Sequence, residues 1–242
     1  MDIKKMLAVG AAVVGTVAMA DVVSSSVVGY QTKDTIPGFN FLAPTFTPVD
    51  GSGNVNLQDI KLNSATAESW TDNLQILDEG GATTEMFIYA TAEESGLEAD
   101  GWLNGDGELA TVTIPYGAGI LADTANETSI TFSGAVATEN SVITAVAGFN
   151  FTGNNTPVGI NIQDIKLDAT TAESWTDNLQ LLDEGGATIE MFIYATAEES
   201  GLEVDGWLNG DGELADVTIE AGQGVLIDVA NDGTEITIPS AM

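Results

Sequence analysis

The apolar positions of the chain fall in short runs and alternations that are typical of β-strands, separated by turn-forming Gly, Asp, Asn and Ser residues. Apolar and polar residues alternate in Asn73–Leu77, and Met86–Tyr89 is rich in aromatic and β-branched side chains. Between these runs Asp78–Gly81 is a turn signal, so the pair predicts a hairpin. The other strands expected in the first half of the chain are Val27–Tyr30, Phe39–Leu42, Leu109–Ile114, Gly119–Leu121 and Ile130–Phe132.

One short helix is expected among these strands. Ser64 is a capping residue in front of Ala65–Trp70, and this order favours the start of a helix. We expect Trp70 to be a core anchor rather than a binding residue. Seven or eight short strands per unit at this spacing predict an all-β fold, either a β-sandwich or a barrel-like domain.

An internal repeat sets the domain organisation. Residues 57–114 and 162–219 are identical at 50 of 58 positions, and the weaker similarity around them includes Gly-Phe-Asn-Phe at 38–41 and at 148–151. Recent duplication is the simpler explanation of this identity, and selection on a shared surface is the alternative. We expect a signal peptide at 1–20 and two tandem β-domains of about 100 residues each, at 21–136 and 137–242.

The N-terminus has the three parts of a secretory signal. Lys4 and Lys5 precede the apolar run Met6–Val17, and Ala18-Met19-Ala20 follows as a small-x-small cleavage site. The apolar run has 12 residues, fewer than the roughly 20 that a membrane-spanning helix needs. We therefore expect a secreted protein, extracellular or at the cell surface, with no membrane span in the mature chain.

Several short motifs recur in the same order in each unit. Gly-Phe-Asn-Phe at 38–41 comes first, Gly101-Trp102 follows later, and Pro115-Tyr116-Gly117-Ala118-Gly119 closes the unit. In this order the chain resembles an uncharacterised secreted bacterial β-module with a Gly-[Phe/Trp]-Asn start and a Pro-Gly-x-Gly-like close, in two tandem copies. The resemblance implies an extracellular β-module without an established activity. The second copy departs from the pattern, because Glu220 stands at the position of Pro115.

Charge and composition exclude several function classes. The chain has 37 Asp and Glu residues against 5 Lys and Arg, a formal charge of −32. Nucleic acid and anionic membrane surfaces need a basic patch, so neither is an expected partner. The sequence also contains neither His nor Cys, the usual general base and thiol nucleophile. We therefore expect no enzyme, no catalytic residue and no organic cofactor.

The octapeptide Gly-Trp-Leu-Asn-Gly-Asp-Gly-Glu occurs at 101–108 and again at 206–213. Its alternating carboxylate and amide oxygens are hard ligands of the kind that Ca²⁺ prefers. An ordinary acidic turn is the alternative interpretation. Glu93 and Glu94, together with Asp78 and Glu79, would complete a site if their loops meet it in space. The candidate calcium ligands are Asp100, Asn104, Asp106, Glu108, Asp205, Asn209, Asp211 and Glu213.

The same octapeptides suggest a sugar site. If Trp102 and Trp207 are exposed, each can stack on a pyranose ring while the neighbouring Asp and Asn side chains bind hydroxyl groups. The alternative is that each Trp packs beneath its loop.

A secreted pair of β-modules without catalytic residues is expected to build a structure or to bind a surface. The first hypothesis is a subunit of an extracellular filament, layer or matrix that self-associates, with Val22–Tyr30 of one molecule packing on the second unit of its neighbour. The alternative for this segment is pairing within its own domain. The second hypothesis is a calcium-dependent adhesin or carbohydrate-binding module with a glycan or surface partner. A glycoside-active enzyme ranks last.

Overall fold

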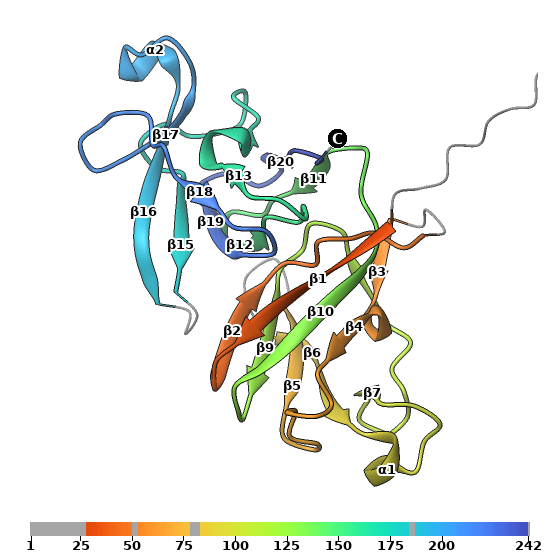
Figure 1. Cartoon of the computed structure of the whole chain (residues 1–242). Helices are drawn as coiled ribbons and strands as arrows, with labels where there is room; N and C mark the ends of the chain where they lie inside the picture. The colour runs from red at the N-terminus through yellow and green to blue at the C-terminus, as the bar shows by residue number, and fades with distance from the viewer. Residues whose placement is uncertain (1–27, 50–52, 78–82, 184–186, 242) are drawn as a thin grey trace, which may run out of the picture.

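The computed structural model describes residues 28–49, 53–77, 83–183 and 187–241. It is an all-β structure of two similar halves, as the strand pattern and the repeat predicted (Figure 1). The expected signal peptide at 1–20 and the turn at Asp78–Gly81 lie outside the described residues.

The strands follow one another in the same order in both halves. In the first half they are β1 (Val28–Thr35), β2 (Gly38–Leu42), β3 (Asn54–Asn56), β4 (Ile60–Leu62), β5 (Asn73–Leu77), β6 (Thr83–Ala90), β7 (Gly101–Leu103), β8 (Thr113–Pro115), β9 (Ile120–Thr124) and β10 (Thr128–Ala135). In the second half they are β11 (Ser141–Thr144), β12 (Gly148–Gly153), β13 (Ile160–Asn161), β14 (Lys166–Leu167), β15 (Asn178–Leu182), β16 (Thr188–Ala195), β17 (Gly206–Leu208), β18 (Thr218–Ile219), β19 (Gly224–Val229) and β20 (Glu235–Ile238). The short helices are α1 (Ala92–Ser95) and α2 (Ala197–Ser200), and the 3₁₀ turns are Leu57–Asp59 and Ile162–Asp164.

Each half is a β-sandwich. In the first half a five-stranded antiparallel sheet, in the order β2-β9-β5-β6-β7, packs on a three-stranded sheet, β1-β10-β4. The second half repeats this with β12-β19-β15-β16-β17 and β11-β20-β14. The predicted hairpin is confirmed, because β5 pairs with β6 in antiparallel register.

The core of each sandwich comes from the alternation that the sequence shows. In the first half Leu74, Phe87 and Ile120 point inward from the five-stranded sheet, and Ile60 and Phe132 meet them from the three-stranded sheet. Full burial of one such side chain contributes about 1.5–3 kcal/mol. The second half has an equivalent core.

The helix predicted at Ala65–Trp70 is wrong, because this segment forms turns. Asn63 accepts the backbone N–H of Ala65 with its side chain, and the Asp72 carboxylate accepts that of Glu68. Side-chain acceptors of this kind compete with helical hydrogen bonds. A helix of six residues without an apolar face has too little packing to win that competition.

The N-terminal strand is paired inside its own half. β1 runs antiparallel to β10, with Val28 opposite Ala135 and Tyr30 opposite Ser133. The alternative stated for this segment, pairing within its own domain, therefore holds for Val28–Tyr30 in this structure, and packing of the segment on a neighbouring molecule stays a prediction. The preceding residues of the expected donor segment, 22–27, lie outside the described residues.

The two halves meet through an approximately two-fold contact. The rings of Phe41 and Phe151, which occupy equivalent positions, lie 4.9 Å apart between centroids. Leu42 forms a bridge with Gln223, and the equivalent Thr152 forms one with Ala118.

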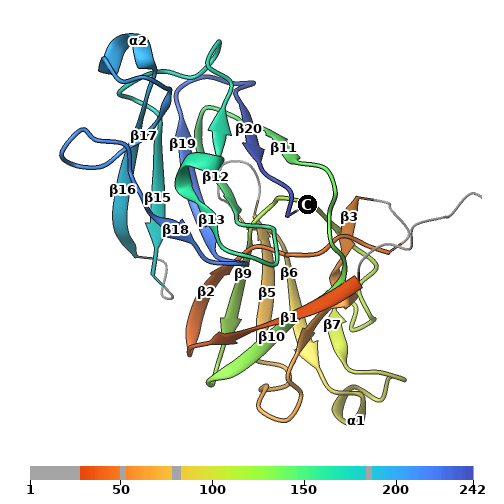
Figure 2. The same cartoon turned by 45° about the horizontal axis from the view of Figure 1, so that its top comes forward.

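Glycines at equivalent positions allow this close approach. A Cβ on Gly224 would lie 2.9 Å from the carbonyl carbon of Phe41, and one on the equivalent Gly119 would overlap the ring of Phe151. Hydrogen bonds cross the contact, from Ala43 N–H to the Gly222 carbonyl at 3.0 Å and from Tyr116 Oη to the Asn155 carbonyl at 2.7 Å. The two sandwiches therefore form one body in which the ends carrying α1 and α2 point away from each other, as Figure 2 also shows.

Candidate functional site

The acidic octapeptide loop is organised by the side chain of Asn104. Its Oδ1 accepts the backbone N–H groups of Asp106 and Glu108, each at 3.0 Å. Backbone bonds from Asn104 N–H to the Glu108 carbonyl and from Gly107 N–H to the Asn104 carbonyl close the turn. Gly107 has a φ of 79°, which favours glycine. Asn209 makes the same two bonds in the second copy.

The other candidate calcium ligands do not gather around this loop. The Asp100 carboxylate accepts the N–H of Ala92 at 2.7 Å, at the start of α1, and Asp205 does the same for Ala197. The acidic side chains of the loop tips, Asp106, Glu108, Asp211 and Glu213, are not buried. Across the described parts of the chain no three His, Cys, Asp or Glu side chains gather as a metal site would require. The geometry thus accounts for the loop as an Asn-capped turn, and calcium at these residues stays a prediction.

An Asn104→Ala variant tests this account of the loop. Two exposed backbone N–H groups would exchange a fixed acceptor for water, so we expect the free energy of unfolding to fall by about 1 kcal/mol. Asp106→Asn is the matched control, because it keeps the turn and removes one charge from a strongly acidic chain. Urea unfolding, with and without calcium, measures both. An Asp106→Asn loss as large as that of Asn104→Ala would point to a bound cation instead.

The tryptophans of the octapeptides are buried. Trp102 is 1% exposed, and its indole N–H donates to the Ile60 carbonyl at 2.7 Å. Its ring meets Tyr89 edge to face at 5.6 Å. Trp207, which is 0% exposed, repeats both contacts. The sugar site predicted at Trp102 and Trp207 is therefore wrong, and the stated alternative, packing beneath the loop, is confirmed.

The exposed tryptophans are Trp70 and Trp175. Their side chains are 51% and 52% exposed, so the expectation of Trp70 as a core anchor is also wrong. In the described residues they are the two non-glycine positions with positive φ, 66° and 64°. For a bulky residue this conformation is an outlier that costs about 1–3 kcal/mol. The sequence carried a signal for it, because Ser-Trp-Thr-Asp-Asn is a turn-forming context in both copies.

A buried carboxylate fixes the loop that carries each exposed tryptophan. Asp72 is fully buried, and its two oxygens accept the N–H groups of Glu68 at 2.8 Å and Ala125 at 2.7 Å. Trp70 N–H donates to the carbonyl of Tyr89 at 2.8 Å. The second copy has the same bonds around Asp177 and Trp175.

In the second copy the pKa of Asp177 shows that burying the carboxylate that holds the loop is unfavourable. Burial raises the pKa of the Asp177 carboxyl, and the N–H groups of Ala230 and Glu173 oppose the shift. A carboxylate held in this position keeps the loop rigid at the expense of its own solvation.

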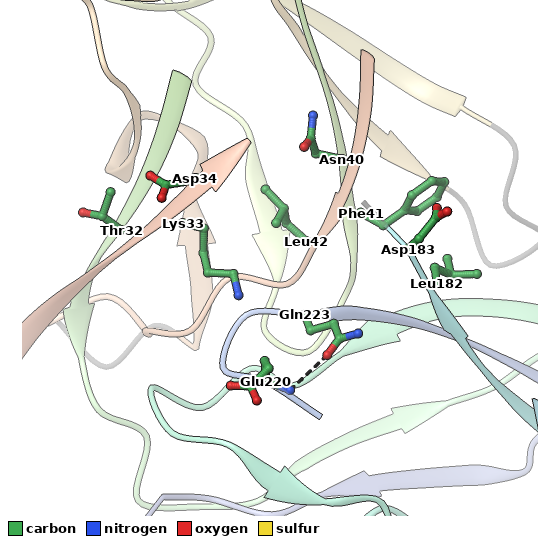
Figure 3. A pocket seen from close by; sticks show the side chains of 10 residues that line it. All are labelled: Thr32, Lys33, Asp34, Asn40, Phe41, Leu42, Leu182, Asp183, Glu220 and Gln223. Atoms are coloured by element: carbon green, nitrogen blue, oxygen red, sulfur yellow. Dashed lines mark hydrogen bonds between the residues drawn. The ribbon is translucent and has the colours of Figure 1, made fainter. Parts of the chain in front are cut away.

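A polar pocket of about 410 Å³ lies where the two halves meet (Figure 3). Lys33 extends from β1 toward the loop of Glu220 and Gln223, and the N–H of Glu220 donates to Gln223 Oε1 at 3.0 Å. Asp34 and Asp183 complete its charged lining. One lysine among three carboxylates gives the pocket no nucleophile paired with a base, and we assign it to the contact between the halves.

Two tyrosines, the half-buried Tyr116 and the buried Tyr194, link the fold to pH. Burial raises the pKa of Tyr116 to about 12, and burial, with Asp205 and Asp177 adding to it, raises that of Tyr194 to about 12. The unfolded chain has a tyrosine pKa near 10, so it ionises first. The stability from the neutral phenols is complete below pH 10 and is lost as the pH rises toward about 12.

We therefore expect the melting temperature to fall steeply between pH 10 and about 12. Tyr116→Phe should make the decline shallower, because one of the tyrosines with a raised pKa no longer ionises. Circular dichroism melts over this range measure it, and Tyr30→Phe, at an exposed tyrosine, is the control. An unchanged pH profile in Tyr116→Phe would exclude a contribution from this phenol.

Comparison with known proteins gave no family model, no curated protein and no solved structure that matches the chain. The resemblance to a secreted bacterial β-module therefore stays an expectation. Within the residues that the structure describes, no helix combines the length and hydrophobicity needed to span a bilayer.

Proposed function

We propose that the protein is a non-enzymatic structural subunit of an extracellular surface assembly, a filament, layer or matrix, that forms by self-association. The observation that carries the proposal is an exposed apolar face at the free edge of β1. The absence of His and Cys from the sequence supports a role without catalysis.

The β1 face consists of Val28, Tyr30 and Val49, which line a groove of about 680 Å³. Tyr30 is 77% exposed, and both valines are more than half exposed. β1 is also an edge, because no other described strand pairs with its outer side. A free strand edge with apolar side chains is a template for pairing with another chain.

The chain's charge argues against an anionic partner, and the apolar β1 face argues for a second copy of this chain. The chain carries −32, so polyanions are repelled, whereas the apolar β1 face offers contact without a charge partner. Two copies also repel each other, and this repulsion is screened by salt or relieved by divalent cations. Assembly should therefore increase with ionic strength, and calcium has a role in it as a counterion whether or not the octapeptide loops bind it specifically.

Light scattering after size exclusion, with negative-stain electron microscopy, tests the proposal on residues 21–242. Ordered particles larger than a monomer are expected in 150 mM salt or calcium, where the screening length is roughly 8 Å, and smaller ones in EDTA at low salt. Tyr30→Glu should leave monomers under all these conditions. Val204→Glu is the control, because Val204 is an exposed valine between α2 and β17, away from β1. Monomers of the unaltered chain in every buffer would end the proposal.

A further inference from the structure

We propose that Trp70 and Trp175 are two equivalent binding platforms for neutral polysaccharide, placed so that one molecule bridges two polymer chains. The proposal starts from a conflict in the fold. A large aromatic side chain is held in a left-handed backbone conformation in both copies, and about half of it is left in solvent. Glycine would adopt this conformation without strain. The backbone conformation therefore does not explain why tryptophan occupies this position.

The rest of each loop shows that the orientation is built in. The carboxylates of Asp72 and Asp177 hold the loops through two N–H groups each. The N–H of each exposed tryptophan is bonded to the tyrosine that packs on the buried tryptophan of the same half. The bonds agree between the copies to within 0.1 Å, at 2.8 and 2.7 Å around Asp72 and at 2.8 Å for both bonds around Asp177. These bonds fix the backbone that carries the ring, so only the torsions of the tryptophan side chain lose freedom when a ligand stacks on it.

The surroundings of the ring indicate the chemistry of the ligand. In sequence Trp70 is flanked by Ser69 and Thr71, and Glu68, which accepts from the Asn126 side chain at 3.4 Å, is also exposed. A flat apolar surface among hydroxyl, amide and carboxylate groups suits a pyranose, which has apolar C–H faces and polar edges. A protein-binding hot spot would instead lie within a larger contact area that excludes water. The charge of the chain repels acidic polysaccharides, and stacking on a pyranose needs no ligand charge, so the proposal takes the neutral class.

The two-fold contact between the halves determines what two such sites do. Trp70 is bonded to the end of β6, just before α1, and Trp175 to the end of β16, just before α2. Figure 1 and Figure 2 both place α1 and α2 at opposite ends of the molecule. Two sites that face apart do not add their affinities on one polymer chain, so they hold two chains together.

Binding and bridging are measured separately with suspended granules of cellulose, chitin and β-1,3-glucan. All proteins carry Tyr30→Glu, so that self-association through the β1 face does not bridge granules. Depletion from solution measures binding, and turbidity with settling rate measures bridging. With at least one polymer, we expect the parent to bind and bridge. Trp70→Gly and Trp175→Gly should each bind about twofold more weakly and no longer bridge, and the double variant should lose binding at least tenfold.

Glycine suits the backbone at these positions, so folded variants are expected, and Trp70→Asn and Trp175→Asn serve as second variants. Oxidation with N-bromosuccinimide, followed by measurement of the intact mass, checks that the two rings are exposed. It should modify two tryptophans in the parent, one in each single variant and none in the double variant. A polymer that is bound should protect both rings of the parent. Equal depletion of parent and double variant, or no depletion by any of the polymers, would overturn the proposal. A single variant that bridges as well as the parent would overturn the two-ended arrangement.

Discussion

Replacing Trp102 with alanine is expected to lower the free energy of unfolding of the first half by about 3–5 kcal/mol. The side chain is 1% exposed and packs on Tyr89, so alanine leaves a cavity lined by core residues. The Ile60 carbonyl would also lose the indole N–H at 2.7 Å, and it is buried there. Many domains are stable by only about 5–15 kcal/mol. The melting temperature of the first half should therefore fall well below its value in the unaltered chain.

Differential scanning calorimetry of the full chain measures this effect as a lower melting temperature for the transition of the first half. Trp207→Ala should act on the other half in the same way, because its contacts are equivalent. Trp70→Ala is the matched control, with the same change of side chain at an exposed site. We expect it to change stability by less than about 1 kcal/mol, because about half of the Trp70 side chain already lies in solvent and alanine, which also has a Cβ, leaves the backbone strain unchanged. Equal losses at Trp102 and Trp70 would contradict the assignment of core and surface tryptophans.

The second large effect is expected at the contact between the halves. In Gly224→Ala the new Cβ would lie 2.9–3.1 Å from backbone atoms of Phe41 and Leu42, which cannot move as a side-chain end can. In Gly119→Ala it would overlap the ring of Phe151, which already packs on Phe41. Each overlap costs about 1–3 kcal/mol if the halves stay together. The double variant should therefore separate the two sandwiches without unfolding either.

Small-angle scattering should show a larger radius of gyration for the double variant. Limited proteolysis should cut it between β10 and β11, at residues 136–140, faster than the parent. Gly105→Ala is the control, because nothing lies within 4 Å of its new Cβ. A compact, protease-resistant double variant would show that the contact adapts to two methyl groups.

The strands were predictable because alternation and turn residues act locally. The runs at Asn73–Leu77 and Ile130–Phe132 became β5 and part of β10, since one face of each is buried. The contact between the halves was not predictable in this way. It depends on Gly119 and Gly224 meeting aromatic residues of the other half, and no periodicity along the chain reports such a contact.

The tryptophans show the limit of residue type as evidence. The acidic neighbours of Trp102 suggest ligand binding, but they belong to a turn above it that Asn104 organises. Residue type predicts Trp70 to be a core anchor, because tryptophan is highly buried on average. Its turn-forming neighbours gave the better indication, since Asp72 caps the loop and leaves the ring outside.

The two-fold contact has a consequence when the protein is at low concentration. Contacts in which Leu42 meets Gln223 and Thr152 meets Ala118 are those that two separate copies of one unit would make. Such a pair would dissociate when diluted, and any property that needs both copies would vanish with it. Because residues 136–140 join the copies, their association is intramolecular and independent of concentration. The chain therefore keeps its two outward-facing ends in a fixed arrangement at any protein concentration.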